Sequence, residues 1–564
     1  MFSTTAHSPN TLSGMTTSPA SGARPWDRHA RLALGLTSIG FLASVICLVL
    51  AGEGVHHFDD LTHYLYAEWA WAEPRFLLDA WGRPGFTALY FLPSGLGWTA
   101  CRLLSAFLTA ASAWLAFAIA RQGKVPAPWV VVPLAYAQPL FFQLSQTTLT
   151  ETPLAFYLTL AVYLAGRGAW GRSCVFISLA TVTRHEAILF IPLWFWAASR
   201  QRVSMLRLWP LVIAPVALNV LTPIAGMTPP ILMLLAPSAS GQYGSGGWLT
   251  FFCRSLEAWG PATTVLAIVG VTTWRRQGTV VRLSFACAAI WFGAQTAVRA
   301  LGLYDSGGYS RFLVPIGPLV AIAALAGWHE LQSADRRRRR RAVLLVGGAM
   351  LLLCAAMERQ LVLHARGADY AAELPELHQA RFAMQVATAA VVGVGLGALW
   401  LDRTRRFDRV ARRALPLVMV ALAILAGYGL SGPLRVPEKA RVVEETLAAL
   451  DRRGLGGREI LSAHIWIDYR TGRMRRPGEP SLRERLERAA VGSIFIWERQ
   501  FAGSADYDIG LDETRSNAAL RLAFQSRPLA YRDEPYLWVF EKIAPWPAPG
   551  ELPDGRPARD FTHR

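Results

Sequence analysis

The stretch HHFDDLTHYLYAEWAWAEP, residues 56–74, decides how this chain is interpreted. It sets two adjacent carboxylates, Asp59 and Asp60, among histidines and aromatic residues, directly after an apolar run that begins near Leu32. An apolar run of about 20 residues is long enough to cross a bilayer. The acidic and aromatic patch is therefore predicted to lie where the chain leaves a membrane.

The composition is that of an integral membrane protein. The chain of 564 residues is 53% hydrophobic and 17% charged, whereas soluble domains carry about 25% charged residues. Its mean hydropathy is positive, at +0.28. The net charge of +18 would favour a nucleic-acid partner in a soluble chain, but here the basic residues form short clusters between apolar runs. We therefore expect membrane lipids around the chain and no nucleic-acid partner.

Apolar runs predict about thirteen membrane-spanning helices. Lys and Arg gather in short loops between them, and with the N-terminus inside every such loop falls on the cytoplasmic side, as the positive-inside rule requires. The C-terminal segment then lies outside. The predicted helices are centred near residues 41, 109, 136, 159, 177, 192, 217, 267, 291, 321, 351, 391 and 422, and the basic loops are residues 121–124, 166–172, 199–207, 274–277, 335–341 and 402–413.

The predicted fold class is an α-helical polytopic membrane protein with a small C-terminal extracytoplasmic α/β domain. Residues 1–30, rich in Ser, Thr, Gly and Pro at their start, are predicted to be a disordered cytoplasmic tail. Residues 31–432 form the membrane domain, whose first outer loop spans residues 52–97. Residues 433–545 alternate helix-like runs (VVEETLAALDRR, LRERLERAA, ETRSNAALRLAF) with strand-like runs (EILSAH, GSIFIW, YLWVFEKI) and form the α/β domain, and residues 546–564 are a flexible tail.

Asp59 and Asp60 open the first outer loop. A carboxylate at this position can act as a general base that removes a proton from a hydroxyl. The alternative is a helix N-cap, because an Asp before a helical run accepts hydrogen bonds from free backbone N–H groups. His56, His57 and His63 surround the carboxylates and make a divalent metal cation a candidate cofactor, although their spacing matches no known ligand pattern.

Other ionisable residues fall in the remaining outer loops, on the same face as the acidic patch. Glu151 lies where two spans meet, and the alternative to a functional role is a carboxylate favoured by the helix dipole. Arg184, His185 and Glu186 interrupt apolar sequence, where charges are usually functional or paired. An ion pair of Arg184 with Glu151 or Glu186 is therefore the alternative to a binding role. Arg311 enters the tenth span and either holds a phosphate through a charge-assisted fork or snorkels to the interface.

The sequence resembles the GT-C superfamily of multi-span glycosyltransferases, which use polyprenyl-phosphate-linked sugars. An acidic residue after the first span is followed by a Pro-containing part of the outer loop and by an Arg after a pair of spans. The last match is an Arg entering a Pro-bearing span, much like the R-[YF]-L-x-P element of protein O-mannosyltransferases, aminoarabinose transferases and lipid-linked-mannose mannosyltransferases. The matching stretches are FDDLTHYLYA, AWGRPGFTALY, ATVTRHEAILFIPLW and GGYSRFLVPIGPLVAI, within residues 30–330.

The resemblance implies an inverting glycosyltransferase of a bacterial inner membrane. It implies transfer of mannose or another hexose or pentose from a polyprenyl-phosphate donor to an extracytoplasmic glycan, lipid or protein acceptor of the cell envelope. Asp59 or Asp60 resembles the family's catalytic carboxylate, and Arg184 and Arg311 resemble its contacts to the donor phosphate. Further candidates for the donor or acceptor site are Glu151, His185, Glu186, Tyr309, Asp305 and Arg83.

The chain departs from the aminoarabinose transferases in one loop. Those enzymes carry an acidic residue before Lys-Pro-Pro, where this chain has GRPG at residues 82–85. Asp79 or Glu73 is then the candidate for a second carboxylate.

Two other classes of membrane protein fit parts of the pattern. A secondary transporter would also place carboxylates and Arg within a helix bundle, but it should contain repeated halves, and this sequence has no clear internal repeat. An O-antigen polymerase or ligase would depend on a large late outer loop, whereas the marked loop here is the first one. The pattern therefore favours the transferase.

We predict that the N-terminus is cytoplasmic and the C-terminal domain extracytoplasmic, because only this orientation keeps all the basic loops inside. Fusions after residue 545 to a reporter active only outside the membrane and to one active only in the cytoplasm measure this directly. Activity of the cytoplasmic reporter alone would overturn the orientation, and the catalytic assignment with it.

Overall fold

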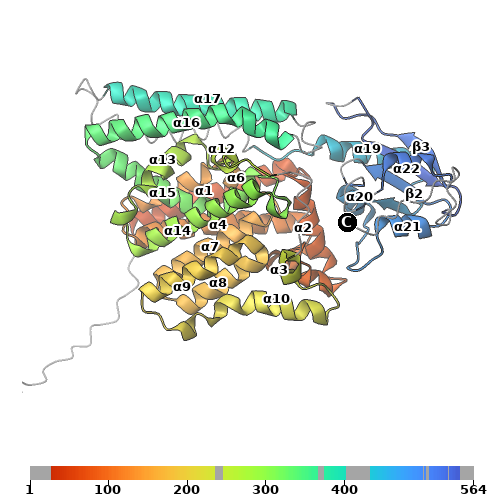
Figure 1. Ribbon diagram of the computed structural model, residues 1–564, viewed down its shortest axis with the longest axis horizontal. Helices are drawn as coiled ribbons and strands as arrows, with labels where there is room; N and C mark the ends of the chain where they lie inside the picture. The colour runs from red at the N-terminus through yellow and green to blue at the C-terminus, as the bar shows by residue number, and fades with distance from the viewer. Residues whose placement is uncertain are drawn as a thin grey trace, which may run out of the picture.

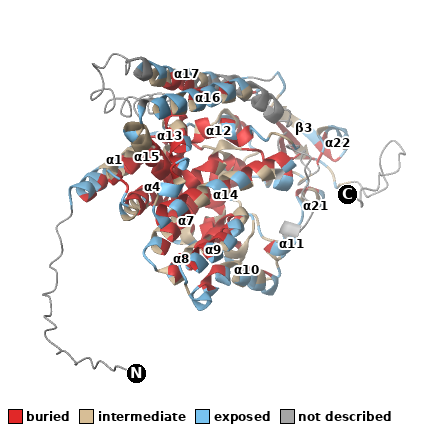
Figure 2. Cartoon of the chain, turned by 60° about the vertical axis from the view of Figure 1, so that its left-hand side comes forward, coloured by how far each residue is buried: buried red, intermediate tan, exposed pale blue. Residues whose placement is uncertain are grey.

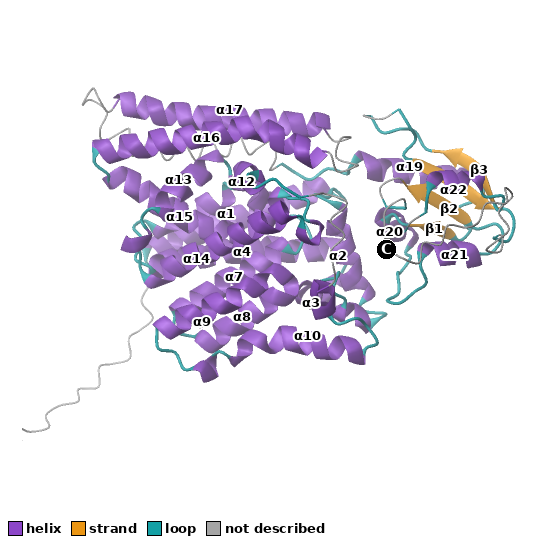
Figure 3. Cartoon of the chain, in the orientation of Figure 1, coloured by secondary structure: helices purple, strands orange, loops and turns teal. Residues whose placement is uncertain are grey.

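The computed structural model describes residues 27–235, 245–365, 374–401, 432–498, 501–502, 507, 509–530 and 533–546. Within them the chain forms a helical body with a small α/β domain attached at one end (Figures 1 and 3). The predicted tails lie almost entirely outside the described residues, as does the predicted span near residue 422. The first helix begins at Arg28, slightly before the predicted boundary, because Asp27 caps it and accepts from the Ala30 N–H.

Helices build the whole body. A helix lies at each predicted span centre within the described part of the chain. They are α1 (Arg28–Ala51), α2 (Phe58–Trp69), α3 (Pro84–Ser94), α4 (Trp98–Gln122), α5 (Val131–Tyr136), α6 (Pro139–Leu144), α7 (Glu151–Gly166), α8 (Trp170–Thr183), α9 (Phe190–Arg200), α10 (Ile213–Ile224), α11 (Pro230–Leu235), α12 (Thr250–Trp259), α13 (Pro261–Val271), α14 (Thr279–Leu301), α15 (Gly317–Ser333), α16 (Arg336–Ala365) and α17 (Leu374–Leu401), with the short 3₁₀ helices η1 (Pro74–Leu78), η3 (His185–Leu189) and η8 (Ser310–Ile316) near the site.

Four helical segments of the described residues are long and apolar enough to cross a membrane: α1, α4, α14 and the segment Ser310–Ser333, which joins η8 to α15. Several other predicted spans are shorter or interrupted. The one near residue 136 is split into α5 and α6, because Pro139 has no N–H with which to continue a helix. The helical class of the prediction is confirmed, while thirteen complete crossings remain a prediction.

Close helix packing holds the body together. Buried residues gather where α7, α8 and α9 meet (Figure 2). Helices α13 and α15 cross through Gly270 and Gly327, where an added Cβ would lie 1.8 Å from the Ala323 oxygen and 1.9 Å from the Leu266 oxygen. No side chain larger than hydrogen fits either position, so these glycines set the distance between the two helices.

Four of the six loops predicted to be cytoplasmic meet around one cavity. This cavity, of about 380 Å³, is lined by Gln122, Lys124, Gly166, Gln201 and Gly278, which come from four of the predicted basic loops or their edges. The candidate site residues are absent from its lining. This arrangement agrees with the two-sided topology predicted from the charges, although it does not set the orientation of the chain.

The C-terminal domain is built on a four-stranded sheet with the order β1-β2-β4-β3. Strands β1 and β2 are parallel and the other pairs are antiparallel. All three predicted strand-like runs form strands, but ETRSNAALRLAF does not form one helix: it contains the end of α22 and then β3, which pairs with β4. The elements are α19 (Glu438–Arg452), β1 (Ile460–Ser462), α20 (Ile465–Thr471), α21 (Leu482–Arg488), β2 (Ile494–Glu498), α22 (Leu511–Ser516), β3 (Leu520–Gln525) and β4 (Leu537–Lys542).

Helix α20 of this domain packs against α2 of the body. The Phe58 ring lies edge-on to the rings of His464 and Trp466, with centroids 5.0 and 6.3 Å apart. Arg470 forms an ion pair with Glu53, which precedes α2. The first turn of α2, which carries the two carboxylates, is therefore held between the helical body and the C-terminal domain (Figure 1).

Candidate active site

His57, and neither aspartate, is the N-cap of α2. Its Nδ1 accepts from the Asp59 N–H at 3.2 Å, and the helix begins at Phe58. Asp59 and Asp60 therefore occupy the first turn of the helix, and the N-cap alternative for them is wrong. Because successive residues of a helix point about 100° apart, the two carboxylates enter different surroundings.

Asp60 anchors α2 to the segment that precedes α7. Its Oδ1 accepts from the Thr148 N–H and from Thr148 Oγ1, both at 2.5 Å, and Thr148 Oγ1 also donates to the Asp60 carbonyl at 2.6 Å. The Asp60 side chain is fully buried, and this burial raises the pKa of Asp60 above its ordinary value, against the opposing effects of Arg102 and Thr148. These contacts give Asp60 a structural role.

Asp59 instead faces a buried arginine. Its Oδ2 accepts from Arg311 Nη2 at 2.5 Å and lies 3.2 Å from His57 Nδ1. Burial alone would raise the pKa of Asp59, but the interactions with His57 and Arg311 outweigh it, and the pKa lies well below its ordinary value. The Asp59 side chain is 26% exposed, so this ionised carboxylate remains accessible.

Two more carboxylates and Arg184 continue the network. Arg184 Nη1 donates to Glu151 Oε1 at 2.9 Å, and Nη2 donates to Glu186 Oε1 at 3.0 Å. Arg311 Nε lies 3.7 Å from the same Glu151 oxygen. Arg184 therefore forms the ion pairs with Glu151 and Glu186 that were the alternative to a binding role. Burial opposes ionisation of Glu186, but Arg184 outweighs it and lowers the pKa of Glu186.

Arg83 completes the charged cluster, which we define as Asp59, Arg83, Glu151, Arg184, Glu186 and Arg311. Arg83 Nη1 lies 2.9 Å from His185 Nδ1. Burial and the charge of Arg83 lower the pKa of His185 to about 4, so the ring is neutral near pH 7. Among the described residues no carboxylate lies within ion-pair distance of Arg83, in contrast to Arg184 and Arg311.

The cluster and its neighbours include most of the site residues predicted from the sequence. Tyr309 packs against the Arg311 guanidinium, with the guanidinium carbon 5.1 Å from the ring centroid. The side chain of Asp305 lies outside the described residues. Two members of the surroundings were not anticipated: Gln295 donates to Glu186 at 3.2 Å, and the Phe312 ring lies under Arg184 at 4.4 Å. Gln295 could have been identified from the sequence, because it is a polar residue within an apolar span.

Several buried polar atoms around the cluster have no hydrogen-bond partner within the described residues. They are Arg311 Nε, Arg311 Nη1, His63 Nδ1, His185 Nε2 and Gln295 Oε1. Buried polar atoms in folded proteins are nearly always satisfied, and the two free Arg311 atoms are a donor pair suited to an anion. These atoms therefore leave the cluster with unused hydrogen-bonding capacity.

The histidines near Asp59 have contacts of other kinds. No group of three or more His, Cys, Asp or Glu in the described chain is placed to hold a metal ion. His57 caps α2, and His63 packs beside Trp81 and Phe86. Burial lowers the pKa of both His56 and His63 to about 3.

The candidates for a second carboxylate have other partners. Asp79 accepts from the Trp81 and Gly82 N–H groups at 2.8 and 3.0 Å. Glu73 is paired with Arg75 at 2.8 Å. Asp79 therefore fixes the backbone at Trp81 and Gly82, and Arg75 neutralises the charge of Glu73.

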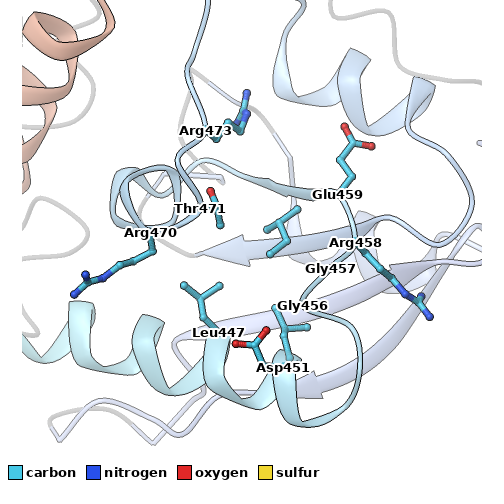
Figure 4. Close-up of a pocket in the computed structure, with 11 residues that line it drawn as sticks. Leu447, Asp451, Gly456, Gly457, Arg458, Glu459, Arg470, Thr471 and Arg473 are labelled. Atoms are coloured by element: carbon cyan, nitrogen blue, oxygen red, sulfur yellow. The ribbon is translucent and has the colours of Figure 1, made fainter.

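A separate cavity of about 470 Å³ lies in the C-terminal domain (Figure 4). None of its lining residues belongs to the charged cluster. All three of its arginines are in ion pairs: Arg458 with Glu541, Arg470 with Glu53 and Glu444, and Arg473 with Asp468 and Glu479. The cavity therefore lacks the open donors found around Arg311.

Comparison with solved structures shows that the chain has an ArnT-like fold. The similar structures are of ArnT from Cupriavidus metallidurans. The structure bound to undecaprenyl phosphate matches with a TM-score of 0.56 and 12% identity, covering 91% of this chain and 98% of ArnT. The apo structure matches with a TM-score of 0.54 and 11% identity, covering 90% and 97%. No family model and no curated protein matches the sequence. The likeness is therefore one of fold.

We predict that Asp60→Ala destabilises the protein while Asp60→Asn does not. The alanine leaves the Thr148 N–H buried without an acceptor, which costs about 1–3 kcal/mol. The asparagine oxygen can still accept from that N–H. Thermal unfolding in detergent compares the variants, and an unchanged Tm for Asp60→Ala would contradict the anchoring role.

Proposed function

We propose that the protein is an inverting glycosyltransferase that moves a sugar from a polyprenyl-phosphate donor to an extracytoplasmic acceptor. One observation carries the proposal: Arg311 donates to the ionised Asp59 through Nη2, while its Nε and Nη1 have no hydrogen-bond partner among the described residues. The proposed base, Asp59, is thus in direct contact with the proposed anion-binding group, Arg311. The ArnT-like fold supports the class, since that protein was crystallised with undecaprenyl phosphate.

In this mechanism Asp59 is the general base. It accepts the proton of an acceptor hydroxyl as that oxygen attacks the anomeric carbon from the side opposite the phosphate. The bond between the anomeric carbon and the phosphate oxygen breaks, and the lipid phosphate leaves with the electron pair. Because attack and departure occur on opposite faces, the configuration inverts. The low pKa of Asp59 keeps its carboxylate ionised at neutral pH, as a base requires.

The departing phosphate needs positive charge beside it. Arg311 has two N–H groups without a hydrogen-bond partner among the described residues, and Arg83 has a guanidinium that no described carboxylate neutralises. We assign both to the phosphate. Arg184, which is held by Glu151 and Glu186, then positions Glu151 beside Arg311 without contacting the donor.

The donor sugar is proposed to be mannose or another hexose or pentose, and the acceptor a glycan, lipid or protein of the envelope. The inner membrane is the proposed location, with the cluster on the extracytoplasmic face. The fold favours this class over a secondary transporter or a polymerase-type protein, because the matched protein is a transferase.

We expect Asp59→Asn to lower kcat by at least about 100-fold, because general base catalysis contributes roughly 100- to 10,000-fold. Asparagine keeps the size of the side chain but cannot take the proton. The assay follows release of labelled sugar from a panel of polyprenyl-phosphate sugars by the purified protein. Asp60→Asn is the matched control and should stay within a few-fold of wild type. Near-normal turnover by Asp59→Asn would remove the proposed base.

We expect Arg311→Ala to raise the KM for the donor and to lower kcat, each by roughly 10-fold or more, since a hydrogen bond to a charged group contributes about 1.5–3 kcal/mol. Arg311→Lys should recover only part of this, because lysine lacks the bidentate fork. Arg254→Ala, which removes an arginine paired with Glu257 on α12, is the control. Unchanged donor kinetics in Arg311→Ala would refute the phosphate role.

A further inference from the structure

One face of α2 runs outward from the proposed base. Asp59, His63 and Tyr66 have the i, i+4, i+7 spacing of residues that share a helix face. The rise of 1.5 Å per residue puts Tyr66 about 10 Å beyond Asp59 along the helix. The face therefore extends over the length of about two sugar rings, starting at the carboxylate.

Trp81 lies along this face. Its ring centroid is 5.4 Å from that of His63 and 6.1 Å from that of Tyr66, with interplanar angles of 34° and 35°. We call His63, Tyr66 and Trp81 the aromatic shelf. Trp81 is 49% exposed, although it is a large apolar side chain. Trp81 is thus the exposed member of the shelf, whereas His63 is buried and Tyr66 is half-buried.

The loop that carries Trp81 is fixed in place. Asp79 accepts from the N–H groups of Trp81 and Gly82. Gly82 lies directly against the Tyr66 ring, where an added Cβ would be 2.7 Å from Tyr66 Cδ1. A side chain at residue 82 would push the loop away from α2, so Asp79 and Gly82 hold the shelf in shape before any ligand arrives.

The shelf combines aromatic faces with polar atoms that have no hydrogen-bond partner among the described residues. His63 Nδ1 is buried and has no partner within the described residues. Neither Trp81 Nε1 nor the Tyr66 hydroxyl has a hydrogen bond to the part of the chain that the structure describes. A ligand that fits must have an apolar face for the rings and hydroxyl groups at its edge for the polar atoms. A neutral pyranose has both.

The far end of the shelf is separated from the arginines of the cluster. The groups that act electrostatically on Tyr66 are Asp79 of the loop and Arg475, Tyr507 and Asp468 of the C-terminal domain. Those that act on His63 are Asp59, Arg83, Arg311 and Arg184. A donor phosphate at Arg311 would therefore lie at the His63 end, which leaves the Tyr66 end for the other substrate.

We propose that the aromatic shelf binds a neutral sugar residue of the acceptor, so that the acceptor of this enzyme is a glycan. The inference rests on the proposed function. The acceptor ring stacks on Trp81, an edge hydroxyl meets the Tyr66 hydroxyl, and the attacking hydroxyl reaches Asp59. Trp81 thereby sets acceptor specificity without contacting the donor.

The test uses the full chain in detergent with whichever polyprenyl-phosphate sugar the wild type consumes. Two reactions are measured: hydrolysis of the donor by water, and transfer to a panel of neutral oligosaccharides (mannotriose, maltotriose, chitotriose), a Ser- and Thr-containing peptide and a phosphorylated lipid. The variants are Trp81→Ala and Trp81→Phe. The control is Trp71→Ala, because Trp71 is 51% exposed but stacks on Phe91 and donates to the Phe91 carbonyl.

We expect transfer to at least one oligosaccharide, with the acceptor KM raised about tenfold in Trp81→Ala, near wild type in Trp81→Phe and unchanged in Trp71→Ala. Donor hydrolysis and donor KM should stay unchanged in all three. An unchanged acceptor KM in Trp81→Ala, an equal effect of Trp71→Ala, or no transfer to any oligosaccharide would overturn the inference. If the wild type neither hydrolyses nor transfers any donor, the proposed function itself fails.

Discussion

The ion pair between Asp59 and Arg311 is the contact on which the arrangement of the site depends. It joins the first turn of α2 to η8, 252 residues further along the chain. The Arg311 side chain is buried, and an unpaired charge there is costly. Glu151 and the rings of Tyr309 and Phe312 fix the guanidinium from its other sides. The same contact joins distant parts of the chain and leaves two Arg311 N–H donors without a hydrogen-bond partner among the described residues.

The two adjacent aspartates illustrate how surroundings divide chemical roles. Asp60 is fully buried and holds Thr148, whereas Asp59 is partly open and faces cations. Burial raises the pKa of the first, and charge lowers that of the second. The C-terminal domain contributes to this division, because Phe58 packs on α20 and fixes the rotation of α2.

Much of the helical fold follows from sequence, because a membrane span needs a long apolar run that local composition reveals. Predictions of secondary structure fail where the local sequence pattern competes with contacts to distant segments or is interrupted by a proline. The run that contains β3 has a helix-like pattern, yet its backbone pairs with β4. The apolar region near residue 136 lacks a continuous helix because of Pro139. The N-cap of α2 is His57 and neither aspartate, because a histidine nitrogen can accept from a backbone N–H as a carboxylate does.

The sequence by itself determined the membrane class, the two-sided charge pattern and the residue types of the site, because composition and spacing carry that information. Asp59, Arg83, Glu151, Arg184 and Arg311 could all be named from their loops. Only the tertiary structure decided which of them are in contact: Asp59 with Arg311, and Glu151 and Glu186 with Arg184. Partners far apart along the chain are set by helix packing in three dimensions, and no local pattern encodes the direction in which a buried side chain points.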